Sequence, residues 1–142
     1  ADGEEFSSRL VADVRARHEA IAESITDETE RVATLAALDQ LHAALDDALA
    51  HVARAGDLSA RDSDRIVATG EKAMSLLLSA ILRSRGTAAA HVWADSVIAT
   101  DDRYGSARPQ RERTREMADA RVRPLLDAGQ TVVFTGFIGH VQ

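Results

Sequence analysis

Cysteine is absent from the 142 residues, and lysine occurs only once, at Lys72. Without cysteine the chain can form neither disulfides nor thiolate metal sites. Its formal net charge of −6 argues against binding to nucleic acid phosphates, which need a basic face. No apolar run approaches the roughly 20 residues that span a bilayer, and the acidic first residues do not form a signal-peptide pattern. The composition therefore predicts a cytoplasmic protein that binds neither nucleic acid nor a membrane.

Aromatic residues are also scarce, at 4% of the chain, although 45% of the residues are hydrophobic. Alanine dominates the apolar residues, and small side chains bury little area each. At roughly 25 cal/mol per Å² of buried apolar area, such a core stabilises a fold less than one built from leucine and phenylalanine. We therefore expect closely packed helices and modest stability for the chain alone.

Residues 1–57 predict two long amphipathic helices, because apolar side chains recur at steps of three and four. The first stripe comprises Phe6, Leu10, Val14, His18, Ile21 and Ile25, and the second comprises Val32, Leu35, Leu38, Leu41, Leu45, Leu49 and Val52. We interpret His18 as part of the interface between these helices. Thr26-Asp27-Glu28-Thr29 interrupts the pattern and contains several residues able to cap a helix, and Gly56 fits the C-cap of the second helix. The short connection favours an antiparallel hairpin.

A third helix is predicted from Ser59, a suitable N-cap residue with Asp62 three positions later, to Gly86. Its inward residues are expected to include Ile66, Met74, Leu77, Leu78 and Leu82. Gly70 lies in its interior, where glycine costs up to about 1 kcal/mol relative to alanine. A bend or a close backbone approach at Gly70 would explain that cost.

Residues 87–142 have a mixed character. Strands are predicted at 89–93, 97–99 and 131–135, a polar loop at 100–109, and a helix at 110–128 that Pro124 interrupts. Met117, Val122, Leu125 and Leu126 are the expected inward residues of that helix. Short links between strand, helix and strand are typical of a parallel sheet. The fold class is therefore a helix-rich α/β domain with a few parallel strands.

Few side chains indicate chemistry by themselves. A glutamate in a helix is usually a solvated surface residue, and for Glu71 alone that interpretation is favoured. Glu71 is adjacent to Gly70, however, and a bend there could direct its carboxylate inward, where it would need a cationic partner such as the amino group of an amino acid. Gly136 and Gly139 follow a strand, where glycine permits close approach to a ligand, but for this pattern alone an ordinary tight turn is the favoured interpretation. Asp101 and Asp102 could bind a metal, but a solvated turn is the simpler interpretation. The histidines show no ligand spacing. We therefore predict neither a metal site nor a catalytic residue.

Four segments, taken in order, resemble the amino-acid kinase domain of aspartate kinases. Residues 58–71 read LSARDSDRIVATGE, residues 100–107 read TDDRYGSA, and residues 132–139 read VVFTGFIG. Between them, residues 76–93 match a small-residue helix followed by a glycine and an alanine-rich strand. The resemblance covers residues 58–139, and only the helical character agrees over residues 1–57. It implies a partial amino-acid kinase fold, with a helical hairpin (1–57) and an α/β part of the substrate-binding lobe (58–142).

That resemblance implies phosphorylation of the β-carboxylate of L-aspartate with ATP, in the biosynthesis of aspartate-derived amino acids such as lysine and threonine. Glu71 would contact the α-amino group of aspartate. The residues expected to line the aspartate pocket are Thr135, Gly136 and Phe137. A loop expected near the site contains Asp101, Asp102 and Tyr104.

In that family, a K-F-G-G-T-S segment holds the phosphates, and a G-R-G-G-S-D segment supplies an arginine for the substrate carboxylate and contacts to ATP. Neither segment occurs in the 142 residues. We therefore expect an internal piece of the enzyme that is inactive alone, with ATP and Mg²⁺ as cofactors of the full-length enzyme and none for this piece. The alternatives are a helical interaction or dimerisation module, a pseudo-enzyme, and a related kinase acting on another carboxylate. Uncovered apolar faces predict a homo-oligomer.

Overall fold

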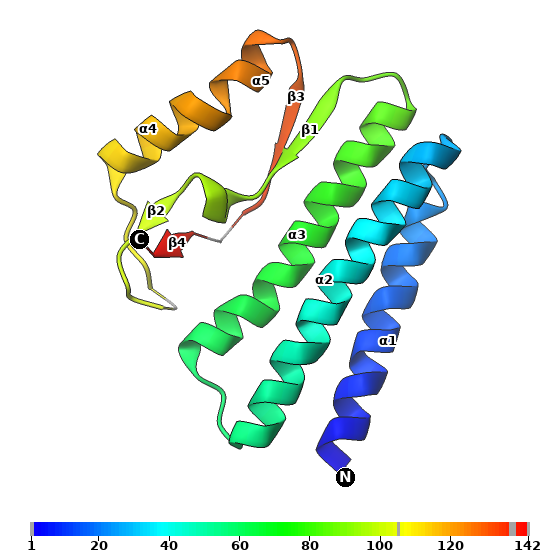
Figure 1. Ribbon diagram of the computed structural model, residues 1–142, viewed down its shortest axis with the longest axis vertical. Coiled ribbons are helices and arrows are strands. Elements are labelled where there is room, and N and C mark those ends of the chain that lie inside the picture. Colours follow the sequence, from blue (N-terminus) through cyan, green and yellow to red (C-terminus); the bar gives the residue numbers. More distant parts are fainter. Residues whose placement is uncertain (1, 105, 137–138, 142) are drawn as a thin grey trace.

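Three long helices lie side by side in the first part of the chain (Figure 1). They are α1 (Asp2–Ala22), α2 (Glu28–Ala55) and α3 (Ala60–Ser84), with α1 and α2 forming the predicted antiparallel hairpin. The structure is a computed structural model that describes residues 2–104, 106–136 and 139–141. Its side-chain description begins at Ser7 and excludes residues 140 and 141, so the prediction for the Phe6 side chain lies outside it.

The helix ends lie where the capping residues predicted them. The Asp27 side chain accepts a hydrogen bond from the Glu30 backbone N–H at 2.8 Å, before the first turn of α2. Gly56 ends α2 in the left-handed region, with φ +71°, and donates its N–H to the Val52 carbonyl at 2.9 Å. Ser59 caps α3 by accepting from the backbone N–H of Asp62. These contacts satisfy terminal backbone groups that have no partner within the helix.

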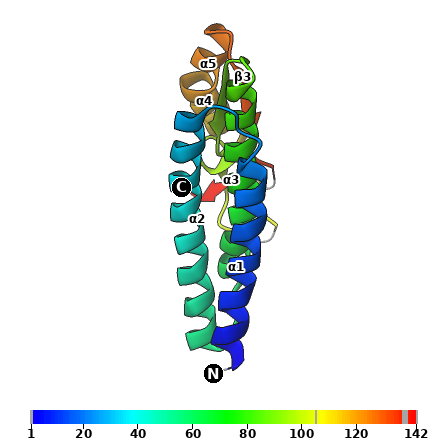
Figure 2. The ribbon, with the colours of Figure 1, turned by 90° about the vertical axis from the view of Figure 1, so that its right-hand side faces the viewer.

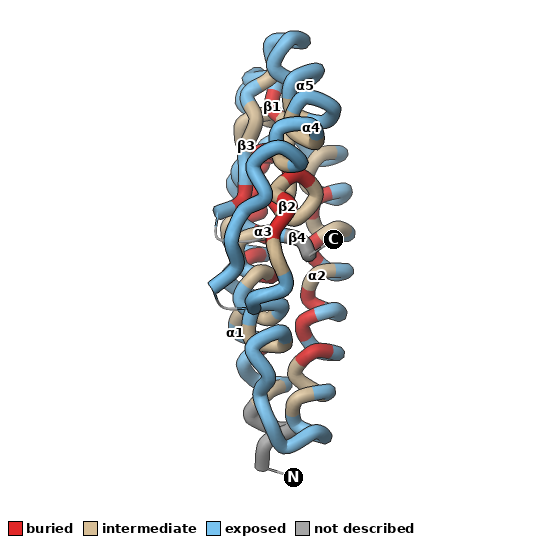
Figure 3. Tube along the Cα trace, turned by 90° about the vertical axis from the view of Figure 1, so that its left-hand side faces the viewer, coloured by how far each residue is buried: buried red, intermediate tan, exposed pale blue. Residues whose placement is uncertain are grey.

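The core lies where the three helices meet, and it is centred on Ile25, Leu38 and Leu77, none more than 1% exposed. Figure 3 shows buried positions recurring along α2. His18 is buried between helices, as predicted. Four other residues that were predicted to face inward are 42–57% exposed, so the prediction was wrong for Leu10, Val32, Met74 and Leu78.

α3 explains part of that difference, because it is covered on two sides. The α1–α2 hairpin packs on one side, and the strands β1 (Ala89–Val92) and β3 (Thr131–Phe134) pack on another. Small residues such as Ala73, Ser75 and Ser79 are buried there instead of Met74 and Leu78. A Cβ built on Gly70 meets no described atom within 4 Å, so the expected close backbone approach at that position is not present.

The strands are short and parallel. β1 (Ala89–Val92) pairs with β3 (Thr131–Phe134), with Ala89 opposite Thr131, and β2 (Ala99–Thr100) pairs with β4 (His140–Val141). The strand expected at 97–99 is displaced, because the 3-10 helix η1 (Ala94–Ser96) precedes it and the N–H groups of Val97 and Ile98 both donate to the Ala94 carbonyl. The chain therefore becomes extended only at Ala99.

The helix expected at 110–128 is divided into α4 (Arg111–Arg121) and α5 (Arg123–Asp127), with Pro124 in the first turn of α5. This confirms the predicted interruption. Leu126 is 56% exposed, so its predicted inward position was wrong. In Figure 1 these two helices lie beside the strands, away from the α1–α2 hairpin, and Figure 2 shows them at the end of the molecule opposite the chain N-terminus. None of the described helices is both long and apolar enough to cross a membrane.

Candidate functional site

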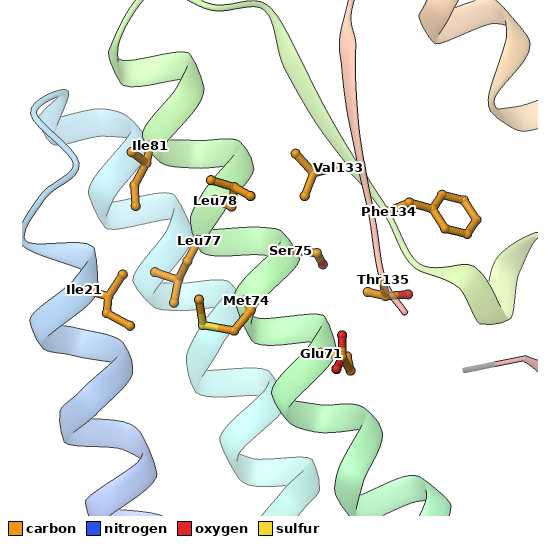
Figure 4. A pocket seen from close by; sticks show the side chains of 10 residues that line it. All are labelled: Ile21, Glu71, Met74, Ser75, Leu77, Leu78, Ile81, Val133, Phe134 and Thr135. Atoms are coloured by element: carbon orange, nitrogen blue, oxygen red, sulfur yellow. The ribbon is translucent and has the colours of Figure 1, made fainter. Parts of the chain in front are cut away.

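A pocket of about 250 Å³ opens between α3 and β3 (Figure 4). Its walls are mainly apolar, with a single charged side chain among the described lining residues. Val133 points toward α3, whereas the Phe134 ring points away from that helix. The described lining residues are Ile21, Glu71, Met74, Ser75, Leu77, Leu78, Ile81, Val133, Phe134 and Thr135.

Glu71 supplies that charge. Its side chain extends from α3 toward the end of β3 and is half-buried (Figure 4). The backbone N–H of Gly136, the second residue after β3, donates to Oε2 of Glu71 at 3.4 Å. This is a long hydrogen bond, and a carboxylate has about four lone-pair sites. Most of the accepting capacity of Glu71 is therefore not used by Gly136.

Thr135 connects the end of β3 to η1. It is 4% exposed, and its Oγ1 accepts the backbone N–H of Ala94 at 2.7 Å. Its own N–H donates to the Val92 carbonyl at 3.3 Å, which extends the pairing between β1 and β3 by one residue. The buried hydroxyl thus holds the first residue of η1 against the strand end.

The structure brings together three of the four residues predicted to bind the substrate: Glu71, Thr135 and Gly136. The fourth, Phe137, lies outside the described residues. A carboxylate that is half-buried beside a small pocket suits a cationic group such as an ammonium, which would compensate its charge. Within residues 7–104, 106–136 and 139, no group of three His, Cys, Asp or Glu side chains could hold a metal ion.

The same fold occurs in aspartokinase crystal structures. The chain matches E. coli aspartokinase III in complex with aspartate and ADP (R-state) at a TM-score of 0.87 and 27% sequence identity. It matches the complex of that enzyme with lysine and aspartate (T-state) at a TM-score of 0.85 and 27% identity. Each match covers 100% of this chain and 30% of the aspartokinase III chain. No protein-family model matches the sequence.

This chain is aspartokinase-like. Its helix-rich architecture with a small parallel sheet is that of part of an aspartokinase, as the motifs at 58–71, 100–107 and 132–139 predicted. The structural match also extends over residues 1–57, where only the helical character of the sequence agreed with the family. The chain spans 30% of the length of the aspartokinase III structures that it matches.

In this aspartokinase-like chain, the loop with Asp101 and Asp102 is organised by its own backbone. Oδ1 of Asp101 accepts the N–H groups of Arg108 at 2.9 Å and Arg103 at 3.4 Å. The hydrogen bond from Arg108, helped by that from Arg103 and by both guanidinium charges, lowers the pKa of Asp101. Its carboxylate therefore closes the loop, whereas Asp102 is exposed.

Tyr104 in the same loop lies near the start of α3. The guanidinium carbon of Arg61 is 6.0 Å from its ring centroid. At 1.5 Å per residue, Arg61 precedes Glu71 by about 15 Å along the helix. The described residues that line the pocket include none of Asp101, Asp102 and Tyr104. The proximity of these three residues to a substrate stays a prediction.

Two charged residues beside the site were not predicted. Lys72 follows Glu71 in α3, and its Nζ lies 2.5 Å from Oδ2 of Asp95 in η1. The same Nζ is 4.9 Å from the ring centroid of Trp93. The signal available in the sequence was that the single lysine of the chain stands next to Glu71. Its partner could not be identified, because Asp95 lies in a segment that local patterns predicted incompletely.

Proposed function

We propose that this chain supplies part of the L-aspartate pocket of an aspartate kinase, which phosphorylates the β-carboxylate of L-aspartate with ATP. The supporting observation is the Glu71 carboxylate, which is half-buried at the pocket and accepts the Gly136 N–H. All 142 residues of the chain carrying it match part of aspartokinase III. That aspartokinase was crystallised with aspartate and ADP. Aspartate and a nucleotide are therefore the partners that we propose for the parent enzyme.

The geometry favours recognition of the α-ammonium group. The weak bond from Gly136 leaves Glu71 able to accept further donors, and an ammonium brings three donors and the opposite charge. Hydrogen bonds to charged groups contribute about 1.5–3 kcal/mol, more than neutral ones. Glu71 would therefore discriminate L-aspartate from succinate, which has both carboxylates but no amino group.

Calorimetric titration of the chain with L-aspartate and with succinate tests this proposal. Glu71→Gln keeps the shape of the side chain and removes its charge, so we expect it to weaken aspartate binding about tenfold or more and to leave succinate binding nearly unchanged. Glu116→Gln, at an exposed position of α4, is the matched control. Equal effects of Glu71→Gln on both ligands would reject the proposed contact.

We further propose that the 142-residue chain alone does not catalyse phosphoryl transfer. That reaction depends on positioning and on charge neutralisation by lysine, arginine and Mg²⁺. The K-F-G-G-T-S and G-R-G-G-S-D motifs through which the family contacts ATP and the substrate carboxylate do not occur in the 142 residues, so we assign no Mg²⁺ or ATP contact to this chain. A coupled ADP-release assay is expected to show no aspartate-dependent turnover, and measurable turnover would refute the expectation.

Self-association is a second candidate function, and exposed apolar side chains favour it. Met74 and Leu78 on α3 and Phe134 on β3 are 46%, 47% and 39% exposed. Exposed apolar groups that gather around one opening promote association. A homo-oligomer would bury this region, which is also where the pocket opens.

A further inference from the structure

Lys72 and Asp95 form an ion pair that is neither fully exposed nor isolated. The Lys72 side chain is 21% exposed and that of Asp95 is 30% exposed. The ammonium of Lys72 also faces the Trp93 ring, with 4.9 Å between Nζ and the ring centroid. Ion pairs on open surfaces contribute little because water screens them and the side chains lose entropy. Partial burial reduces the screening of this pair, and the Trp93 ring gives Lys72 a cation–π contact in addition.

The pair is one of three contacts that join three segments around the candidate site. Lys72 joins α3 to η1 through Asp95. The hydrogen bond of the Ala94 N–H to Thr135 Oγ1, at 2.7 Å, joins η1 to the end of β3. The third contact runs from the N–H of Gly136 back to Glu71 on α3, at 3.4 Å.

These contacts close a ring, because each segment uses two residues that are adjacent in the chain. α3 contributes residues 71 and 72, η1 contributes 94 and 95, and the end of β3 contributes 135 and 136. Successive helix residues differ by about 100° in direction, so neighbouring side chains of α3 can face two different segments. A ring of three restraints fixes the relative position of its members better than any one contact.

We propose that Lys72 and Asp95 are positioning residues for the Glu71 carboxylate: their ion pair holds η1 against α3, which keeps the end of β3 in place opposite Glu71. Asp95 also compensates the Lys72 charge, so that the cation adjacent to Glu71 in the chain neither neutralises that carboxylate nor repels an ammonium ligand. This inference rests on the proposed role of Glu71 in binding the α-ammonium group of L-aspartate.

The test uses two measurements on the 142-residue chain with Lys72→Met and Asp95→Asn. The first is amide hydrogen exchange at Ala94, whose buried N–H reports whether η1 stays against the β3 end. The second is the ratio of the affinities for L-aspartate and succinate. We expect about three- to tenfold faster exchange at Ala94 and a similar loss in the affinity ratio in either variant.

Two controls separate positioning from general stability. Lys72→Arg keeps the charge, so the Ala94 exchange rate and the affinity ratio should both stay close to those of the unaltered chain. Glu30→Gln breaks a comparably buried ion pair with Arg83 at the far end of α3, and it should change neither value. Exchange at Leu38, in the core of the helical bundle, should stay unchanged in every variant. Equal acceleration at Ala94 and Leu38 would indicate a merely structural role and overturn the inference.

Glu71→Gln distinguishes failure of the inference about Lys72 and Asp95 from failure of the proposed function. If it abolishes the preference for aspartate while Lys72→Met and Asp95→Asn leave the preference and Ala94 exchange unchanged, the inference is wrong and the proposed function stands. If the unaltered chain shows no preference for aspartate, or Glu71→Gln does not reduce it, the proposed function fails and the inference fails with it.

Discussion

At the scale of single residues, Gly56 and Gly70 have opposite backbone requirements. Gly56 has a φ of +71°, in the left-handed region where a Cβ is unfavourable, whereas Gly70 lies inside α3 with open space around a built Cβ. Gly70→Ala is expected to raise the free energy of unfolding by about 0.5–1 kcal/mol, since alanine loses less backbone entropy in a helix. Urea unfolding followed by circular dichroism measures the change.

Gly56→Ala is the matched control and should lower the free energy of unfolding by about 1–2 kcal/mol, because it places a Cβ in the left-handed region. A destabilising Gly70→Ala would contradict the described environment of that residue. It would indicate that glycine is needed there for a contact that the described residues do not make.

The Thr135 hydroxyl is the acceptor of a buried backbone group. Thr135→Val keeps the shape of the side chain but leaves the Ala94 N–H without its 2.7 Å partner. An unsatisfied buried donor costs about 1–3 kcal/mol, so we expect a loss of that size in the free energy of unfolding. Thr131→Val, at the exposed first residue of β3, is the control and should change stability little. Equal effects of the two substitutions would show that the hydroxyl of Thr135 is not needed.

At the scale of elements, α1 and α2 meet through a pair of buried imidazoles. Nδ1 of His18 lies 2.9 Å from Nε2 of His42, and the rings stack at an interplanar angle of 13°. In the neutral state, one nitrogen donates its proton and the other accepts it. Burial lowers the pKa of both histidines, and His18 and Arg15 lower that of His42 further, while Asp39 and Glu19 oppose this.

Stability should therefore depend on pH. Both pKa values are lower in the folded than in the unfolded chain, so the unfolded chain binds more protons as the pH falls below about 6.5. The free energy of unfolding should be constant above that pH and decrease below it. Unfolding measured between pH 7.5 and 5 tests this. His42→Leu should reduce the decrease, whereas His51→Gln, at an exposed position of α2, should not. If the free energy of unfolding of His42→Leu decreased by the same amount over this pH range, groups other than this histidine pair would be responsible.

At the scale of the whole molecule, the apolar side chains around the pocket predict association. Light scattering on the unaltered chain should show a mass above 15.3 kDa that increases with concentration. Leu78→Glu places a charge in this region and should reduce the mass toward that of the monomer. Val32→Glu, at a more exposed position on α2, is the control and should have no effect. A monomer at all concentrations would contradict the prediction.

Local residue patterns were sufficient for most element boundaries. Asp27, Gly56 and Ser59 act as caps through groups only three or four residues away, and Pro124 interrupts its helix through its own ring. Local patterns singled out Glu71 and Gly136 as candidates, whereas the inclusion of Thr135 and the convergence of the three residues came from the resemblance to the aspartate kinases. The role of these residues in binding stays a prediction.

Interactions between distant segments decided the rest. The sequence determined the caps, the long helices and the strands β1 and β3, because these depend on contacts within one or two turns or on short apolar runs. Only the tertiary structure decided that Thr34 and His42, rather than Val32, face the core of the bundle, and that Met74 and Leu78 remain exposed. It also paired Lys72 with Asp95. The physical reason is that α3 is covered from two sides, and which of its side chains are buried depends on neighbours that its own sequence does not specify.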